Sequence, residues 1–200
     1  MKVWAGILAA GQGRRLGGRP KALLELRGVT FLEMIAESAR AAGVSGVAAV
    51  VGYHAGEVRP LAAACCDIVV DNPKPELGMA SSARILAQAI PDDVPLLLWP
   101  VDVPHVRPST VETIVGAGAR CASRIVIPVC TARGHPPLLP ASVVAALRTM
   151  DDEARLDLFI ETVGGDPLLI EVDDPAVEQD VDTAEDLRWL EEQGAGGGKF

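Results

Sequence analysis

The sequence reads Ile7-Leu8-Ala9-Ala10-Gly11-Gln12-Gly13-Arg14-Arg15-Leu16-Gly17-Gly18-Arg19-Pro20-Lys21 where an apolar run breaks into a glycine-rich, basic stretch. The apolar run, residues 3–10, predicts a buried β-strand, and the glycines predict a loop after it. Gly11 and Gly13 permit backbone angles that other residues avoid, and they leave the backbone N–H groups open to a phosphate. In a chain whose formal net charge is −9, this concentration of cations favours a phosphate-binding loop over a solvated surface turn.

Two better-known phosphate loops do not fit this stretch. A Walker A loop needs a lysine and a hydroxyl residue after its last glycine, but Gly18 is followed by Arg19-Pro20. A dinucleotide-binding fingerprint needs a third glycine, where this chain has Leu16, and an acidic residue at the end of the second strand, which reads Val51-Gly52-Tyr53. A Walker A loop is therefore excluded, and a dinucleotide-binding fingerprint is only weakly supported.

The bulk composition favours one soluble domain. A chain of 200 residues with 49% hydrophobic content can bury a core, so we expect a single domain over residues 1–193 and a flexible glycine-rich tail over residues 194–200. No apolar run approaches the roughly 18 residues that span a bilayer, and the first strand leaves no room for a leader peptide. We therefore expect a cytoplasmic protein that binds no membrane, and the acidic charge argues against nucleic acid. The four cysteines show no metal-binding spacing and are expected to be small buried side chains.

Predicted strands and helices alternate along the rest of the chain. We expect strands at residues 3–10, 47–51, 67–71, 95–101, 124–129 and 167–172, and helices at residues 31–42, 54–66, 79–90, 109–116, 141–150 and 153–163. Thr30 caps the first of these helices and Gly43 ends it, while Pro60 would have to lie in the first turn of the second. This alternation predicts an α/β fold with a doubly wound, mostly parallel sheet and helices on both faces.

Asp102 is the first charged residue after the predicted strand at residues 95–101. Ligands in open α/β sheets bind outside the carboxyl ends of the strands, where the strand order reverses. If this strand lies beside the first, Asp102 faces the glycine loop. An Asp after a strand often only forms a turn or caps a helix, but a carboxylate opposite a phosphate loop is where a hard cation binds. We favour metal ligation.

Several motifs together resemble one enzyme family. They are Leu8-Ala9-Ala10-Gly11-x-Gly13-x-Arg15-Leu16-Gly17 with Pro20-Lys21, then Gly78-Met79-Ala80-Ser81-Ser82, Pro100-Val101-Asp102-Val103-Pro104-His105, Gly134-His135-Pro136 and Asp180-Val181-Asp182-Thr183-Ala184-Glu185-Asp186-Leu187. In this order they resemble the nucleotidyltransferases that activate phosphorylated small molecules with an NTP, and most of all the molybdenum-cofactor cytidylyltransferase and guanylyltransferase group. The resemblance implies the Rossmann-like fold of the nucleotide-diphospho-sugar transferases.

The resemblance also implies a role for each motif. The nucleotide would be bound by Leu8, Ala9, Ala10, Gly11, Gly13, Lys21, Gly78, Ser81, Ser82 and Asp102. Catalysis would depend on Arg15, Lys21 and Asp102, a magnesium ion would be held by Asp102 and Asp182, and the acceptor would face Gly134 and His135. Two alternatives stay open: simple helix capping by Ser81 or Ser82, and metal ligation by Asp180 in place of Asp182. His135 by itself is typical of a structural imidazole.

The implied reaction needs little acid–base chemistry. A phosphate monoester has a second pKa of about 6, so its oxygen can attack the α-phosphorus of an NTP without a general base. The cation would bridge the attacking phosphate and the α-phosphate, while loop amides, Arg15 and Lys21 hold the departing pyrophosphate.

Three functions follow as hypotheses. The first is a nucleotidyltransferase for molybdopterin or its cofactor form, with a molybdoenzyme or chaperone as protein partner. The second is a nucleotidyltransferase for a sugar or polyol phosphate. The third is a nucleotide-binding module without turnover. Lys21 and the two acidic positions speak against the third.

The expected donor rests on Ala10. The cytidylyltransferases of the group resemble Leu-Ala-Ala-Gly at this point, whereas the guanylyltransferases carry Leu-Ala-Gly-Gly. A methyl group there narrows the slot for the base and should favour a pyrimidine, so we expect CTP over GTP. Leu16 and Ala80 depart from the usual methionine and serine of the group.

Overall fold

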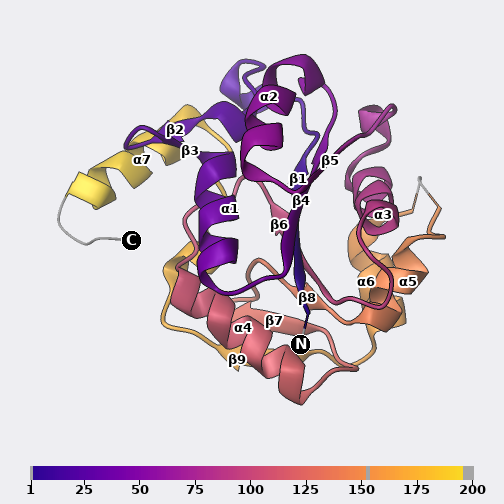
Figure 1. Cartoon of the computed structure of the whole chain (residues 1–200). Coiled ribbons are helices and arrows are strands. Elements are labelled where there is room, and N and C mark those ends of the chain that lie inside the picture. The colour runs from indigo at the N-terminus through magenta and orange to yellow at the C-terminus, as the bar shows by residue number, and fades with distance from the viewer. Residues whose placement is uncertain (1, 152–153, 196–200) are drawn as a thin grey trace.

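A seven-stranded sheet forms the centre of the computed structural model, which describes residues 2–151 and 154–195 (Figure 1). The strands lie in the order β5-β4-β1-β6-β8-β7-β9. Their bounds are Trp4–Ala9 for β1, Gly46–Val51 for β4, Ile68–Asp71 for β5, Leu96–Pro100 for β6, Val126–Val129 for β7, Leu138–Leu139 for β8 and Leu168–Glu171 for β9. Every pairing is parallel except those of β8, which runs antiparallel to β6 and β7. The predicted mostly parallel sheet is confirmed.

The strand order reverses at β1. β4 pairs with one edge of β1 and β6 with the other, so chain connections leave in opposite directions from this point. The expected adjacency of β1 and the strand before Asp102 is therefore confirmed. In a parallel sheet this arrangement opens a crevice beyond the carboxyl ends of the two strands.

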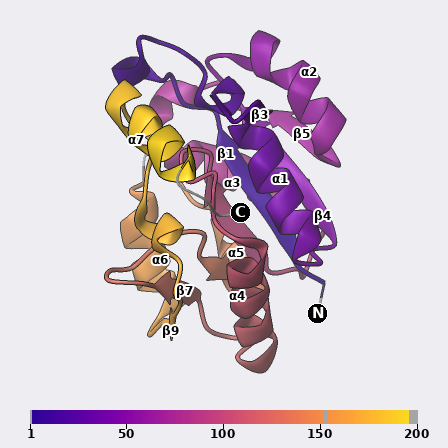
Figure 2. The ribbon, with the colours of Figure 1, turned by 90° about the vertical axis from the view of Figure 1, so that its left-hand side faces the viewer.

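Helices cover both faces of the sheet and enclose two hydrophobic cores (Figures 1 and 2). One face packs against α1 (Phe31–Ala41), α2 (Ala55–Cys65) and α4 (Pro108–Arg120), and the other against α3 (Met79–Ala89), α5 (Ala141–Leu147) and α6 (Leu156–Gly164). Side chains of β1 alternate between the two cores, with Ile7 in the first and Leu8 in the second. Doubly wound topology follows, as predicted.

Two smaller features complete the fold. A short hairpin of β2 (Glu25–Leu26) and β3 (Val29–Thr30), which the sequence did not predict, leads into α1. Helix α7 (Ala184–Ala195) lies beside this hairpin (Figure 1). Residues 194 and 195 of the predicted flexible tail form the end of α7, and residues 196–200 lie outside the described residues.

The ends of α1 agree with the sequence prediction, whereas the position of Pro60 in α2 differs from it. The Thr30 hydroxyl accepts a hydrogen bond from Glu33 N, and the Glu33 carboxylate accepts one from Thr30 N, which makes a capping box. Pro60 lies inside α2 and not in its first turn. Proline has no N–H to donate to the carbonyl of Gly56, but both residues are exposed, so water can bind that carbonyl.

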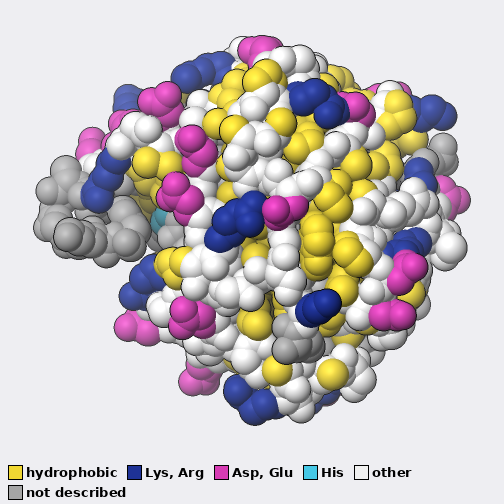
Figure 3. Space-filling model, in the orientation of Figure 1, with side chains coloured by type: hydrophobic (Ala, Val, Ile, Leu, Met, Phe, Trp, Pro, Cys, Tyr) yellow, Lys and Arg dark blue, Asp and Glu magenta, His cyan; other side chains and the backbone are white. Residues whose placement is uncertain are grey.

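Surface charge, helix length and cysteine burial can be compared with the expectations about nucleic acid, membranes and thiols. On the face in Figure 3, Lys and Arg side chains are scattered among Asp and Glu and form no continuous basic stripe. No described helix has the length and apolar character needed to cross a membrane. The four cysteines carry free thiols and are half-buried, where full burial was expected, because they lie at or near the ends of helices and strands.

Candidate active site

The loop after β1 folds back on itself in a way that requires glycine. Gly13 has a φ of 65°, and a side chain there would bring its Cβ within 2.0 Å of the Arg19 carbonyl oxygen. The Gly13 carbonyl accepts hydrogen bonds from Leu16 N at 2.9 Å and Gly18 N at 3.0 Å. Leu16 is buried in the first core, so it anchors a loop whose arginines stay exposed.

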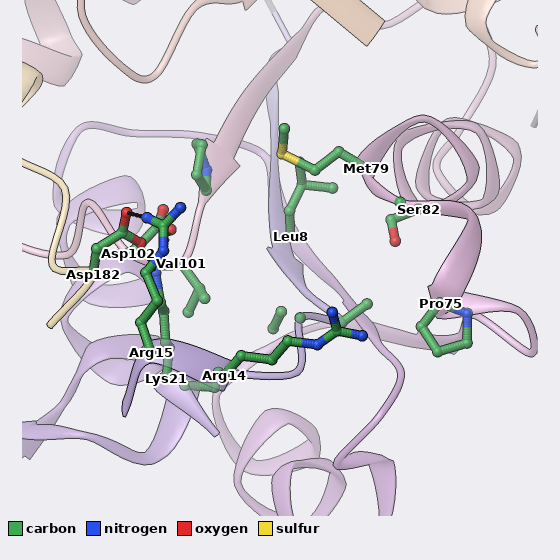
Figure 4. Close-up of a pocket in the computed structure, with 17 residues that line it drawn as sticks. Leu8, Arg14, Arg15, Lys21, Pro75, Met79, Ser82, Val101, Asp102 and Asp182 are labelled. Atoms are coloured by element: carbon green, nitrogen blue, oxygen red, sulfur yellow. Dashed lines mark hydrogen bonds and ion pairs between the residues drawn. The ribbon is translucent and has the colours of Figure 1, made fainter. Parts of the chain in front are cut away.

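This loop lines a cavity of about 320 Å³ with residues from the ends of β1 and β6 and the start of α3 (Figure 4). The lining includes most of the predicted site, namely Leu8, Ala9, Ala10, Gly11, Gly13, Arg15, Lys21, Gly78, Ser82, Asp102 and Asp182. It also includes residues for which the sequence predicted no individual role in the site, namely Arg14, Ala22, Pro75, Met79, Pro100 and Val101. The cavity therefore lies at the crevice where the strand order reverses.

Ser81, which was predicted to bind nucleotide, lies behind the cavity wall. Its hydroxyl donates to the Gly78 carbonyl at 2.9 Å and accepts from Asn72 Nδ2 at 2.8 Å. Asn72 Nδ2 also donates to the Ser82 hydroxyl at 2.9 Å. Neither serine caps α3, whose N-cap is Gly78. Asn72 thus holds the first turn of α3, and its place directly after a predicted strand, like that of Asp102, is the signal that could have identified it.

Lys21, Asp102 and Asp182 meet at the edge of the cavity (Figure 4). Lys21 Nζ donates to Asp102 Oδ2 at 2.8 Å and to Asp182 Oδ1 at 2.6 Å, and Arg15 forms an ion pair with Asp182 from the solvent side. Burial lowers the pKa of Lys21, but the two carboxylates outweigh it and raise that pKa above its ordinary value. The hydrogen bond from Lys21 is the largest cause that lowers the pKa of Asp182. Lys21 and Asp182 therefore carry charge at neutral pH.

The two carboxylates suit a divalent cation. Both already contact one cationic atom, Lys21 Nζ, and carboxylate oxygens are the ligands that magnesium and manganese prefer. Within the described residues no group of three or more His, Cys, Asp or Glu side chains converges. Magnesium is commonly held by one or two carboxylates, with substrate phosphates and water as the other ligands, so this pair fits such an ion.

Asp180 lies outside the cavity lining. Loss of water around its carboxyl group and the nearby charge of Asp102 raise the pKa of Asp180. It makes no hydrogen bond to Lys21, whereas Asp182 bonds to Lys21 and Arg15. The geometry therefore favours Asp182 as the partner of Asp102.

We expect Asp182→Asn to weaken activation by magnesium by about tenfold or more, as the loss of a charged ligand would, and Asp180→Asn to weaken it much less. Pyrophosphate release measured against magnesium concentration in both variants checks this expectation. A larger shift in Asp180→Asn would reverse the assignment.

The predicted acceptor residues divide between a second cavity and the packing behind it. His135 lines a cavity of about 570 Å³ that shares Leu8, Met79 and Pro100 with the first. Burial lowers the pKa of His135, against the charges of Asp180 and Asp102, and its buried Nδ1 has no hydrogen-bond partner among the described residues. Gly134 does not line this cavity.

Comparisons with known proteins identify the family. The family model described as a MobA-like NTP transferase domain matches residues 5–174. The chain belongs to this family. The resemblance that the sequence motifs predicted is therefore confirmed at the level of the MobA-like NTP transferases, and an NTP is the substrate that the family implies.

Individual relatives span nearly the whole chain. Nicotine blue oxidoreductase of Paenarthrobacter nicotinovorans is 31% identical over 188 residues, which cover 90% of this chain and 92% of that protein. Rv0371c of Mycobacterium tuberculosis H37Rv is 30% identical with a TM-score of 0.78, covering 96% of this chain and 99% of the other. A structure of Rv0371c in complex with manganese matches at 28% identity and a TM-score of 0.73, with the same coverage.

A more distant neighbour supports the fold alone. Molybdopterin-guanine dinucleotide biosynthesis protein A of Archaeoglobus fulgidus superposes with a TM-score of 0.74 at 16% identity, covering 98% of this chain and 100% of the other. The predicted nucleotidyltransferase-like α/β fold is thus confirmed.

Proposed function

We propose that this protein is a metal-dependent nucleotidyltransferase that transfers an NMP, from CTP in preference to GTP, to a phosphorylated small molecule. The observation that carries the proposal is the convergence of Lys21, Asp102 and Asp182 on a cavity closed by a glycine loop. Anionic phosphates fit a loop with two exposed arginines, Arg14 and Arg15, on its rim.

In the proposed reaction an oxygen of the acceptor phosphate attacks the α-phosphorus of the NTP. A new phosphorus–oxygen bond forms, and the bond between the α-phosphorus and the bridging oxygen breaks, so that pyrophosphate leaves with both bonding electrons. Asp102 and Asp182 would hold a magnesium or manganese ion, which neutralises phosphate charge. Lys21 and Arg15 offset the charge that builds up on the departing pyrophosphate. A dianionic acceptor phosphate needs no general base.

The second cavity supports an acceptor with a flat ring system, whose faces can pack against apolar walls, over a sugar or polyol phosphate. Its walls are mostly apolar, with Leu8, Leu77, Met79, Leu98, Pro100, Pro137, Leu156 and Ile160. Arg155 and Asp157 at its edge pair with each other. Sugar hydroxyls buried against such walls would lose hydrogen bonds to water without replacement. Molybdopterin or its cofactor form is therefore the acceptor that we propose, with synthesis in the cytoplasm and transfer to a molybdoenzyme or its chaperone.

An oxidoreductase is a second candidate, because one relative with 31% identity is named nicotine blue oxidoreductase. No cysteine lines either of the two cavities in the described part of the chain, so a redox reaction would depend on bound cofactor. Oxidation of NADH or NADPH in the presence of a quinonoid dye would favour this candidate.

The deciding experiment measures pyrophosphate release from each of the four NTPs with magnesium, over a panel of acceptors. The panel contains molybdopterin, sugar phosphates and polyol phosphates. Release that requires molybdopterin supports the proposal. Release with a sugar phosphate alone would establish the other acceptor class, and no release with any pair would contradict transfer.

We expect CTP to bind the magnesium-loaded protein about tenfold more tightly than GTP, because Ala10 lines the cavity and its methyl group, which glycine lacks, would leave less room for a purine. Isothermal titration with both nucleotides checks this. Ala10→Gly is the matched variant and should narrow the difference. Tighter binding of GTP to the wild type would contradict the choice of CTP but not the proposed reaction.

A further inference from the structure

The segment between β9 and α7, residues 172–183, carries Asp182 and is tied to other elements at both ends. At its start, the buried carboxylate of Asp174 accepts hydrogen bonds from Arg107 N at 3.0 Å and from the Thr110 hydroxyl at 2.6 Å. Near its end, Val181 N donates to the Asp102 carbonyl at 2.8 Å. Asp182 is the next residue. Its distance from Asp102 therefore depends on how the whole segment is held.

Glu178 ties the middle of this segment to the loop after β7. Its Oε1 accepts hydrogen bonds from the backbone N–H groups of Cys130, Thr131 and Ala132, and its Oε2 accepts one from the Thr131 hydroxyl, at 2.5–3.0 Å. These bonds, with that of the Thr131 hydroxyl first, lower the pKa of Glu178 to about 2. The carboxylate is consequently ionised near neutral pH and can accept from all four donors.

The same loop continues into the residues beside the second cavity. His135 N donates to the Val177 carbonyl at 2.7 Å. A side chain at position 134 would place its Cβ within 2.5 Å of that carbonyl oxygen, so Gly134 permits the close approach. Loop 130–135 and segment 172–183 are thus joined at Glu178 and at the neighbouring residue Val177, and His135 and Asp182 belong to two segments that are bonded to each other.

We propose that Glu178 is a positioning residue for the Asp102–Asp182 pair. It lies outside every motif that indicated the family and lines neither cavity. By holding loop 130–135 against segment 172–183, it fixes the place from which Asp182 reaches Lys21 and faces Asp102. This inference rests on the proposed function, because it takes the two aspartates as metal ligands.

Titration of manganese into the whole protein tests the inference without a need to know the acceptor. We expect Glu178→Ala to weaken manganese binding by about tenfold, as the loss of an outer residue that orients a metal ligand commonly does. Glu178→Gln keeps an oxygen that can accept from the backbone and should bind manganese more tightly than Glu178→Ala. Thermal unfolding of the wild type and of each variant would be followed by circular dichroism, so that a folding defect is recognised.

Asp166→Asn is the matched control. Asp166 accepts a hydrogen bond from Arg124 at 2.8 Å and joins the same pair of strands, β7 and β9, at their opposite end. It should leave manganese binding unchanged. If Asp166→Asn weakens binding as much as Glu178→Ala, the effect is general loosening and the inference is wrong. It is also wrong if Glu178→Ala binds manganese as the wild type does.

Asp102→Ala separates failure of the inference from failure of the proposed function. If the wild type and Asp102→Ala bind manganese equally, the aspartates are not ligands, and both proposals fall together. Amide hydrogen exchange gives a readout that needs no metal: Glu178→Ala should accelerate exchange at Val181 N as well as at Thr131 N. Faster exchange confined to the loop would overturn the coupling between loop and segment.

Discussion

Asp102→Ala is expected to lower the rate of pyrophosphate release by at least about 10³-fold while the protein stays folded. The carboxylate lies after the carboxyl end of β6, beside β1 and the glycine loop, where it would face the phosphates of the proposed NTP. Its removal would leave Asp182 as the remaining carboxylate for the cation and leave triphosphate charge uncompensated. Loss of one well-placed electrostatic group commonly costs about 10²- to 10³-fold, and loss of a metal ligand adds to that.

Asp71→Ala is the matched control for this prediction. Asp71 also lies at the carboxyl end of a parallel strand, β5, and pairs with Arg59, but it does not line the cavity. It should retain wild-type turnover. Steady-state rates with saturating magnesium and NTP compare the two variants. If Asp102→Ala turns over like the wild type, the assignment of Asp102 to the cation is wrong.

Lys21→Ala is expected to have two opposite effects. Turnover should fall about 10²-fold, because the ammonium group no longer offsets charge on the departing pyrophosphate. Manganese binding without nucleotide should become tighter, because Lys21 Nζ contacts both carboxylates and competes with a metal ion for them. Single-turnover kinetics and manganese titration measure the two effects separately.

Lys21→Met provides the matched variant, since it keeps most of the side-chain volume and removes the charge. It should reproduce both effects of Lys21→Ala. Arg15→Ala should weaken NTP affinity at least as much as it lowers the rate, because Arg15 is exposed and pairs only from the solvent side. Weaker manganese binding in Lys21→Met would show that the lysine does not compete with the metal, and wild-type turnover would exclude its role in the reaction.

Local patterns in the sequence were enough for most of the sheet and its layers. Burial alternates along β1, and α1 and α3 each have one apolar face. Both patterns repeat every few residues, so the spacing of apolar residues in the sequence shows them directly. Strand β8 was missed because two residues, Leu138 and Leu139, have no period. The position of Pro60 inside α2 was missed because the hydrogen bond that proline cannot make falls on an exposed part of the helix, and that exposure depends on the packing of the whole chain.

Some residues of the candidate site were predictable from local sequence patterns, and others were not. Sequence by itself determined the glycine loop and Asp102, because a loop after a buried strand and a carboxylate after another are local features that a doubly wound sheet brings together. Only the tertiary structure decided that Lys21 joins Asp102 and Asp182, which lie 81 and 161 residues away along the chain. It also decided that Asn72 donates hydrogen bonds to both serines of α3 and that Glu178 accepts hydrogen bonds from loop 130–135. Such contacts depend on distances between segments that no local period encodes.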